Sequence, residues 1–169
     1  VLDAYYGKAY TCGENLNRKD EAINILREIT RKYPDSRYTI DSYMLIAEYL
    51  FGAPSRKQPR KTIESIPYYK KVLDLVSSKG ITSKYYDQAL YKLGWAYFRI
   101  GGLNKKNYEE AIAYFTSLCD DLERAEEIFA GQALPDYVDT RLRDEALEYI
   151  ATSFVSIQKK IDDSKSGVG

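Results

Sequence analysis

Apolar residues recur every three to four positions along almost the whole chain, and helix-breaking residues fall between the periodic stretches. This spacing predicts paired helices and not strands, whose apolar positions would alternate. We therefore expect an all-α chain of about seven helices, at residues 1–12, 17–32, 37–51, 62–79, 84–100, 107–129 and 138–160.

Capping residues define several of the predicted ends. We expect Asn17 to cap the second helix and Gly80 to follow the fourth, since short polar residues favour helix starts and glycine favours helix ends. Asn107 with Glu110 resembles a capping box for the sixth helix. Pro67 is acceptable in the fourth helix if it lies near the first turn, where backbone donors have no intrahelical partner.

The segment 52–61 holds two prolines and four cations, Arg56, Lys57, Arg60 and Lys61, which predict an exposed loop. Such cations can contact an acidic partner or lipid head groups, although a solvated loop explains them more simply. The last residues, 162–169, are polar and predict a frayed, disordered tail. We expect residues 1–161 to form a single domain.

One supersecondary unit recurs along the chain. In its clearest copy a small residue lies among large ones on a first helix, and a small and a large residue follow on a second helix: Leu90, Leu93, Gly94, Tyr97, Ala111 and Phe115. A second copy comprises Gly7, Tyr10, Ala22, Leu26 and Pro34. Weaker copies comprise Tyr43, Ile46, Ala47, Leu50, Ser65 and Tyr69, and then Leu147, Ile150, Ala151 and Phe154 without a second helix.

This pattern resembles the tetratricopeptide repeat, in which the small residue marks the close approach of two helices. The resemblance implies a right-handed α-solenoid of about three and a half helical hairpins; another α-solenoid is the alternative. The small residues Gly7, Ala47, Gly94 and Ala151 are 40, 47 and 57 positions apart, against ~34 in the family. Insertions at turns would explain the excess, because lengthening a connection costs little entropy.

The segments 32–38 and 86–97 resemble a bacterial envelope branch of this family, which includes the lipoprotein of the outer-membrane barrel-assembly machinery, the Tol-Pal coordinator and gliding-motility scaffolds. The resemblance implies a periplasmic or envelope-associated binding role. Val1 is not an initiator methionine and no leader precedes it, so we expect a segment of a longer or processed protein.

In such a stack the first helix of each hairpin lines a concave surface. Positions three before and one, four and five after the small residue should face it. These are Lys8 and Thr11; Met44, Glu48 and Phe51; Tyr91, Trp95, Phe98 and Arg99; and Glu148, Thr152 and Val155. Aromatic residues and arginine are typical of binding hot spots. The alternative is that Trp95 and Phe98 pack against the sixth helix or an adjacent hairpin.

Composition argues against catalysis and cofactors. The chain has no histidine, and its 25 basic and 25 acidic residues cancel, so we expect no nucleic-acid partner and no common general base. Cys12 and Cys119 are far apart and predict neither a zinc site nor a redox pair. Glu145 and Glu148 have the spacing of a carboxylate metal site without its histidine, so an acidic solvated face is expected there.

The predicted function is a non-catalytic scaffold that binds a peptide segment or helix of another protein, with no cofactor, metal or small-molecule substrate. A cytoplasmic peptide-binding adaptor is the first alternative. A structural segment of a longer solenoid is the second, because the last half unit would leave an apolar helix uncovered and open to self-association.

Overall fold

The computed structural model describes residues 1–52, 59–79, 84–136 and 138–167, and the regular elements in these ranges are all helices. The all-α prediction is therefore confirmed. The chain divides into two compact units, unit 1 at Val1–Ile81 and unit 2 at Thr82–Gly169. A single domain over residues 1–161 stays a prediction, as does the handedness of the stack.

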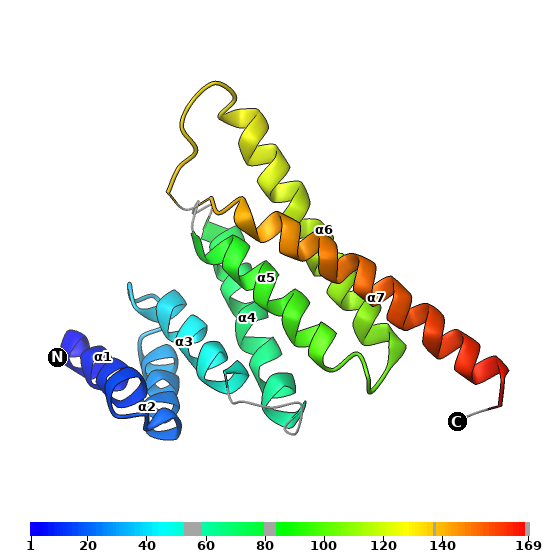
Figure 1. Cartoon of the computed structure of the whole chain (residues 1–169). Helices are drawn as coiled ribbons and strands as arrows, with labels where there is room; N and C mark the ends of the chain where they lie inside the picture. The colour runs from blue at the N-terminus through cyan, green and yellow to red at the C-terminus, as the bar shows by residue number, and fades with distance from the viewer. Residues whose placement is uncertain (53–58, 80–83, 137, 168–169) are drawn as a thin grey trace. The chain divides into compact units, whose positions relative to one another are not determined.

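Unit 1 contains α1 (Leu2–Tyr10), the short π-helix η1 (Thr11–Asn15), α2 (Lys19–Lys32), α3 (Thr39–Phe51) and α4 (Pro59–Lys79). Each α-helix packs against the next along the chain, so that α1 pairs with α2 and α3 with α4 (Figure 1). Buried apolar side chains from both hairpins form one core, which includes Ala9, Cys12, Ala22, Leu26, Ile29, Ile46, Tyr49 and Leu50.

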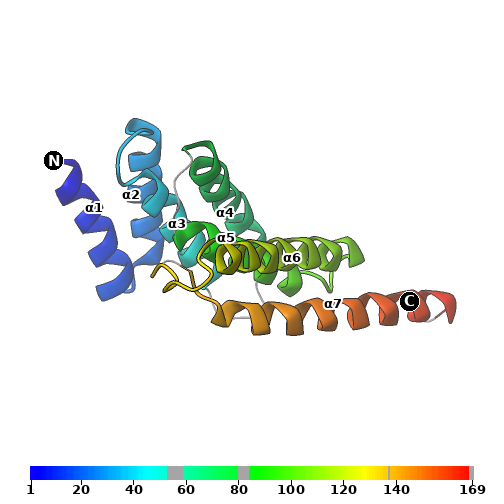
Figure 2. The same cartoon turned by 90° about the horizontal axis from the view of Figure 1, so that it is seen from above.

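Unit 2 contains α5 (Lys84–Arg99), α6 (Lys105–Ile128) and α7 (Arg141–Lys165). Helix α6 packs against both α5 and α7, and α7 also contacts α5. Figures 1 and 2 both show α7 lying alongside α6. The buried residues of this unit include Leu90, Leu93, Ala96, Ala111, Phe115, Leu118, Leu122 and Ala146.

Several predicted helix ends are wrong. Asn17 has a positive φ of 52°, and the N-cap position of α2 is occupied by Arg18, whose side chain makes no capping hydrogen bond. Asn104 caps α6, accepting a hydrogen bond from the Lys106 backbone N–H. Asn107 instead donates its side-chain amide to the Ile100 carbonyl at 2.9 Å, which ties the start of α6 to the end of α5.

The prediction that Pro67 lies in a first turn is also wrong, because α4 begins at Pro59 and encloses it. The carbonyl four residues earlier, that of Ile63, loses its helical donor. Both residues are exposed, so water can satisfy this carbonyl. Helix α7 ends at Lys165, so residues 162–165 of the expected tail are helical. Gly80 lies outside the described residues.

The close approach of paired helices occurs where predicted in the second and third hairpins. Ala47 is fully buried on α3. On α5, a Cβ added to Gly94 would lie 2.6 Å from the ring of Phe115 on α6. A methyl group cannot be accommodated at that distance without a shift of the ring. Gly94 therefore allows α5 and α6 to pack at this spacing.

The small residues chosen for the first and last hairpins are wrong. Gly7 is exposed, and nothing lies within 4 Å of a Cβ added there. The fully buried small residue of α1 is Ala9, two positions later. On α7, Ala151 is exposed, and Ala146 and Ser153 occupy the buried side. Every position counted from Gly7 or Ala151 is therefore displaced around its helix.

Candidate functional site

Counting from Ala9 identifies a surface of unit 1 that we call the tyrosine face, made of Tyr6, Tyr10, Glu14, Tyr38 and Asp41. Tyr6, Tyr10 and Glu14 are four residues apart and follow one side of α1 and η1. The Tyr6 ring stacks on the ring of Tyr38, which directly precedes α3, with centroids 4.4 Å apart. The Tyr10 side chain is 48% exposed.

The charges around Tyr6 are acidic. Burial raises the pKa of Tyr6 to about 12, and the nearby Asp41 carboxylate contributes to the rise. Tyr10 and Tyr38 also raise the pKa of Tyr6 through their charges. The side chains of Tyr6, Tyr10, Tyr38 and Asp41 therefore lie near one another. This part of the face therefore combines aromatic rings with a carboxylate.

One end of the face is closed by a network among Asp3, Arg37 and Tyr38. The Arg37 guanidinium donates to Asp3 Oδ1 at 2.9 Å and to the Tyr38 hydroxyl oxygen at 2.7 Å, and the Tyr38 hydroxyl donates to Asp3 at 2.8 Å. The hydrogen bond from Tyr38, the hydrogen bond from Arg37 and the charge of Arg37 lower the pKa of Asp3. The Arg37 guanidinium is thus already bonded to Asp3 and Tyr38.

At the other end, η1 brings Gly13 and Glu14 against Tyr49 of α3. A Cβ at Gly13 would overlap the Tyr49 hydroxyl, so only glycine lets this ring approach. The Tyr49 hydroxyl is buried and has no hydrogen-bond partner of good geometry. Burial raises the pKa of Tyr49, and the Glu14 carboxylate raises it further. Single π-helical turns are frequent at functional sites.

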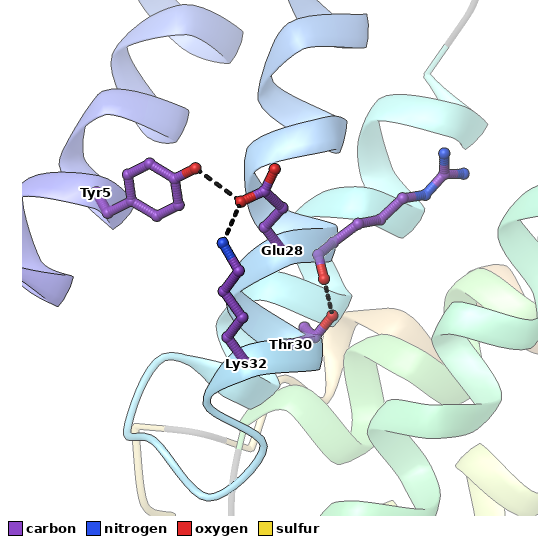
Figure 3. A network of polar contacts seen from close by, with 5 residues as sticks. Tyr5, Glu28, Thr30 and Lys32 are labelled. Carbon is purple, nitrogen blue, oxygen red and sulfur yellow. Dashed lines mark hydrogen bonds and ion pairs between the residues drawn. The ribbon is translucent and has the colours of Figure 1, made fainter.

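A second network fixes α1 against α2 and so sets the orientation of the tyrosine face. The Tyr5 hydroxyl donates to Glu28 Oε2 at 3.0 Å, and Lys32 Nζ donates to the same oxygen at 2.9 Å (Figure 3). On the same helix, Thr30 Oγ1 donates to the Arg27 carbonyl. Because Tyr5 bonds to α2, its neighbour Tyr6 is directed toward Tyr38.

The five residues predicted to bind a partner in unit 1 do not form one open surface. Met44 and Phe51 are each only 7% exposed and belong to the core. Glu48 is half-buried and accepts a hydrogen bond from Tyr69 of α4 at 2.9 Å. Lys8 is exposed and lies 3.9 Å from Glu21 of α2, and Thr11 is exposed.

In unit 2 the predicted aromatic residues of α5 contact α7. The Tyr149 ring of α7 lies 4.2 Å from that of Trp95 and 4.9 Å from that of Phe98. Trp95 and Phe98 are half-buried. Tyr91 lies beside Trp95, at 6.5 Å, and burial raises its pKa to about 12. Trp95 and Phe98 therefore pack against a neighbouring helix, which is the alternative given for them in the sequence analysis.

Arg99, also predicted to bind a partner, is exposed at the end of α5. On α7, Glu148 and Thr152 are exposed, and the Thr152 hydroxyl donates to the Glu148 carbonyl. Val155 is exposed too, as are Leu147 and Phe154 on the same helix. Binding by Arg99, Glu148 and Thr152 stays a prediction.

Unit 2 also contains a buried carboxyl group. Asp87 of α5 is 6% exposed, and one of its oxygens has no hydrogen-bond partner. Burial raises the pKa of Asp87 to about 7, with a further contribution from a hydrogen bond to Asp121 of α6. The Asp87 carboxyl group, when it carries a proton, can donate a hydrogen bond to the Asp121 carboxylate.

Among the described residues no three histidine, cysteine or acidic side chains are grouped as metal ligands would be, and no helix has the length and apolar character to cross a bilayer. Arg60 pairs with Glu64 at 3.0 Å, and Lys61 lies 3.9 Å from Asp20. The prediction that Arg60 and Lys61 lie in a loop is wrong, because both belong to the first turn of α4, which begins at Pro59. Arg56 and Lys57 fall outside the described residues.

Reasoning from the sequence missed Tyr6, Tyr10, Glu14, Tyr38 and Asp41 as one surface. The cause is the choice of Gly7 over Ala9 as the small residue of the first helix. Both are small and lie in a tyrosine-rich stretch, so composition does not separate them. The position within the repeat does separate them. Ala9 and Gly94 each lie six residues after the start of a segment that matches the family model reported in the next paragraph.

The tetratricopeptide repeat model matches two stretches of the chain, residues 3–36 and 88–121. The first stretch covers α1 and α2, and the second covers most of α5 and α6. No curated protein and no solved structure matches the chain. Each unit thus contains one hairpin that is similar to a tetratricopeptide repeat.

Proposed function

We propose that the protein is a non-catalytic scaffold that binds a peptide segment or helix of a partner protein on the exposed side of the first helix of unit 1. The observation that supports this most directly is the tyrosine face of unit 1, where Tyr10 is 48% exposed whereas Tyr6 and Tyr38 stack on each other. Large aromatic side chains bury much area at low entropic cost, so exposed ones are typical of interfaces.

The absence of histidine from the sequence supports a role without turnover. Histidine is the commonest acid–base group near neutral pH. Tetratricopeptide repeats also typically act as scaffolds, although a fold does not by itself define a function.

For the setting, we propose a bacterial envelope complex, with a cytoplasmic adaptor as the alternative. The support for the envelope is the resemblance of segments 32–38 and 86–97 described above. Localising the full-length protein in fractionated cells separates the two settings, and a purely cytoplasmic pool would exclude the first.

A peptide array tests the scaffold function. Twelve-residue peptides that sample basic, acidic, neutral, apolar and helical patterns are incubated with the labelled chain, and hits are titrated in solution. A scaffold predicts saturable binding at one peptide per chain and recovery of the peptide unchanged. If no pattern binds above its scrambled version, or if the peptides are chemically altered, the proposed function is wrong.

A second candidate, a segment that packs end to end with another helical stack, is supported by α7. Leu147, Phe154 and Val155 are 50%, 58% and 70% exposed on this helix, and a neighbouring helix could bury them. Sedimentation over a concentration series tests this role. Self-association that a Val155→Asp substitution abolishes would favour it, whereas a monomer at all concentrations would exclude association between copies.

A further inference from the structure

We propose that the tyrosine face of unit 1 binds a basic segment, in which two lysine or arginine side chains are four residues apart in an extended chain. This inference rests on the proposed function and specifies its ligand. It is drawn from charge, from the arrangement of the rings and from one unpartnered hydroxyl group.

The unpaired charge on the face is negative. No ion pair in the described part of the chain includes Glu14 or Asp41. The nearest cations are occupied elsewhere: Arg37 bonds to Asp3, and Lys8 lies toward Glu21 on α2. A basic guest would therefore gain two carboxylate partners without displacing an existing ion pair.

One further cation borders the face. Lys19 of α2 lies 6.0 Å above the Tyr49 ring, near the Glu14 end. It shows that a tyrosine ring here already accepts an ammonium group at cation–π distance. It also makes the Glu14 end less acidic than the Asp41 end, so the cation near Asp41 should contribute more.

The aromatic rings suit the same guest. Lysine and arginine place an apolar stem and a charged head against aromatic faces, at about 0.5–2 kcal/mol for each cation–π contact. Tyr6 and Tyr38 form a stacked pair, and Tyr10 exposes its ring beside them. The Arg37 guanidinium lies 4.8 Å from the ring of Tyr38 on the same face, so one of these rings already contacts a cation and Tyr10 is the exposed ring left for the guest.

An unsatisfied group also indicates a missing partner. The Tyr49 side chain is 4% exposed, and its hydroxyl has no hydrogen-bond partner of good geometry. A buried hydroxyl left without a partner costs about 1–3 kcal/mol. The Glu14 carboxylate already acts on this hydroxyl group, so a polar group of the guest that binds beside Glu14 would lie near Tyr49.

The spacing of the guest follows from helix geometry. Tyr6, Tyr10 and Glu14 span eight positions, which at about 1.5 Å each extend about 12 Å along the helix. Asp41 raises the pKa of Tyr6 and so lies near the Tyr6 end of this stretch. Glu14 lies at the opposite end. An extended chain advances about 3.3 Å per residue, so two cations four residues apart are about 13 Å apart and match this distance.

A pair of fluorescein-labelled peptides tests the proposal on the complete chain. The basic peptide has twelve residues with two lysines four apart among Ser, Gly and Leu, and its twin carries glutamates at these positions. Fluorescence anisotropy should show the basic peptide binding at least about tenfold more tightly than its twin. Its affinity should fall as salt rises, because the pairs are exposed.

Variants locate the site. Tyr10→Ala and the double change Glu14→Gln with Asp41→Asn should each weaken the basic peptide by about tenfold. The matched control is Tyr33→Ala with Asp35→Asn, since Tyr33 is 44% exposed at the end of α2 and Asp35 is exposed beside it. The control should leave affinity unchanged, and circular dichroism should be equal for all variants.

The outcomes separate the two proposals. Equal binding of the acidic twin, or equal loss in the control, would overturn the basic-segment proposal. If array peptides of another class bind and the basic peptide does not, this proposal fails and the scaffold function stands. If no peptide of any class binds, the scaffold function itself fails.

Discussion

The first helices of the first and third hairpins both carry aromatic residues, but the structure uses them differently. On α1, Tyr6 stacks on Tyr38 and Tyr10 is exposed. On α5, Trp95 and Phe98 contact Tyr149 of α7 within unit 2. The residue types are similar, and the difference is that a further helix of the same unit packs against the aromatic side of α5.

The comparison shows that an aromatic stripe on a repeat helix has two uses. Where another helix of the unit lies against the stripe, the rings add to the core. Where the stripe has open positions, as at Tyr10, they remain available to a guest. The following changes test this difference, from the largest expected effect to the smallest.

Replacing Trp95 by alanine should have the largest effect. The ring contacts Tyr91, Phe98 and Tyr149, so its loss should lower the free energy of unfolding of unit 2 by about 3 kcal/mol. Chemical denaturation followed by circular dichroism measures this value. A change below about 0.5 kcal/mol would mean that α7 does not cover this side of α5.

Alanine substitutions at Gly7 of α1 and Gly94 of α5 should change stability in opposite directions. Gly94→Ala puts a methyl group against the Phe115 ring and should cost about 1–3 kcal/mol. Gly7→Ala, with open space around the new methyl group, should stabilise the chain by up to about 1 kcal/mol through helix propensity. Thermal melts of both variants compare them directly. Equal destabilisation would restore Gly7 to the helix interface.

The Asp87 carboxyl group should make unit 2 less stable as pH rises. Its pKa is raised to about 7, from an ordinary value of 3.8. Between these values the unfolded chain releases the proton and the folded chain keeps it, so stability falls across this range and is lowest above it. Asp87→Asn should flatten this dependence and gain about 1–2 kcal/mol at pH 8.

Denaturation of both proteins from pH 4 to pH 8 checks this prediction, with Asp35→Asn as an exposed control. If the wild type and Asp87→Asn show the same slope against pH, the pKa of Asp87 is not raised in the folded chain. The result would then leave the comparison of the two aromatic faces unaffected.

The smallest stability effect should come from Tyr10→Ala. The ring is about half exposed, and substitutions at such surfaces usually change stability by about 0.5 kcal/mol or less. The variant should therefore unfold like the wild type even though it binds the basic peptide more weakly. A loss of stability close to that of Trp95→Ala would show that Tyr10 is a packing residue.

Helical periodicity predicted the fold class and the order of the seven α-helices in the described part of the chain, because each helix needs one apolar side whatever it packs against. Caps were harder. Asn17, Asn104 and Asn107 are the same residue type in polar loops, and tertiary contacts decide which of them caps a helix. The binding residues were the hardest to predict. Counting from Ala9 and not from Gly7 shifts the predicted binding face by about 200° around α1.

The alternative uses of Trp95 could not be separated from the sequence either. Whether its ring lies against a helix or a guest depends on where α7 begins and on which side of α7 is buried. The buried side is set by Ala146 and Ser153, whereas Ala151 fits the repeat pattern equally well in the sequence. Only packing distinguishes these two registers.

Tryptophan quenching tests the contrast between the two faces most directly, since Trp95 is the only tryptophan of the chain. In the wild type, acrylamide should quench Trp95 weakly, and saturating basic peptide should change nothing. In a Tyr10→Trp, Trp95→Phe protein, quenching should be strong and should fall when the peptide binds. Strong quenching of Trp95 that the peptide suppresses, with no response at position 10, would contradict the account.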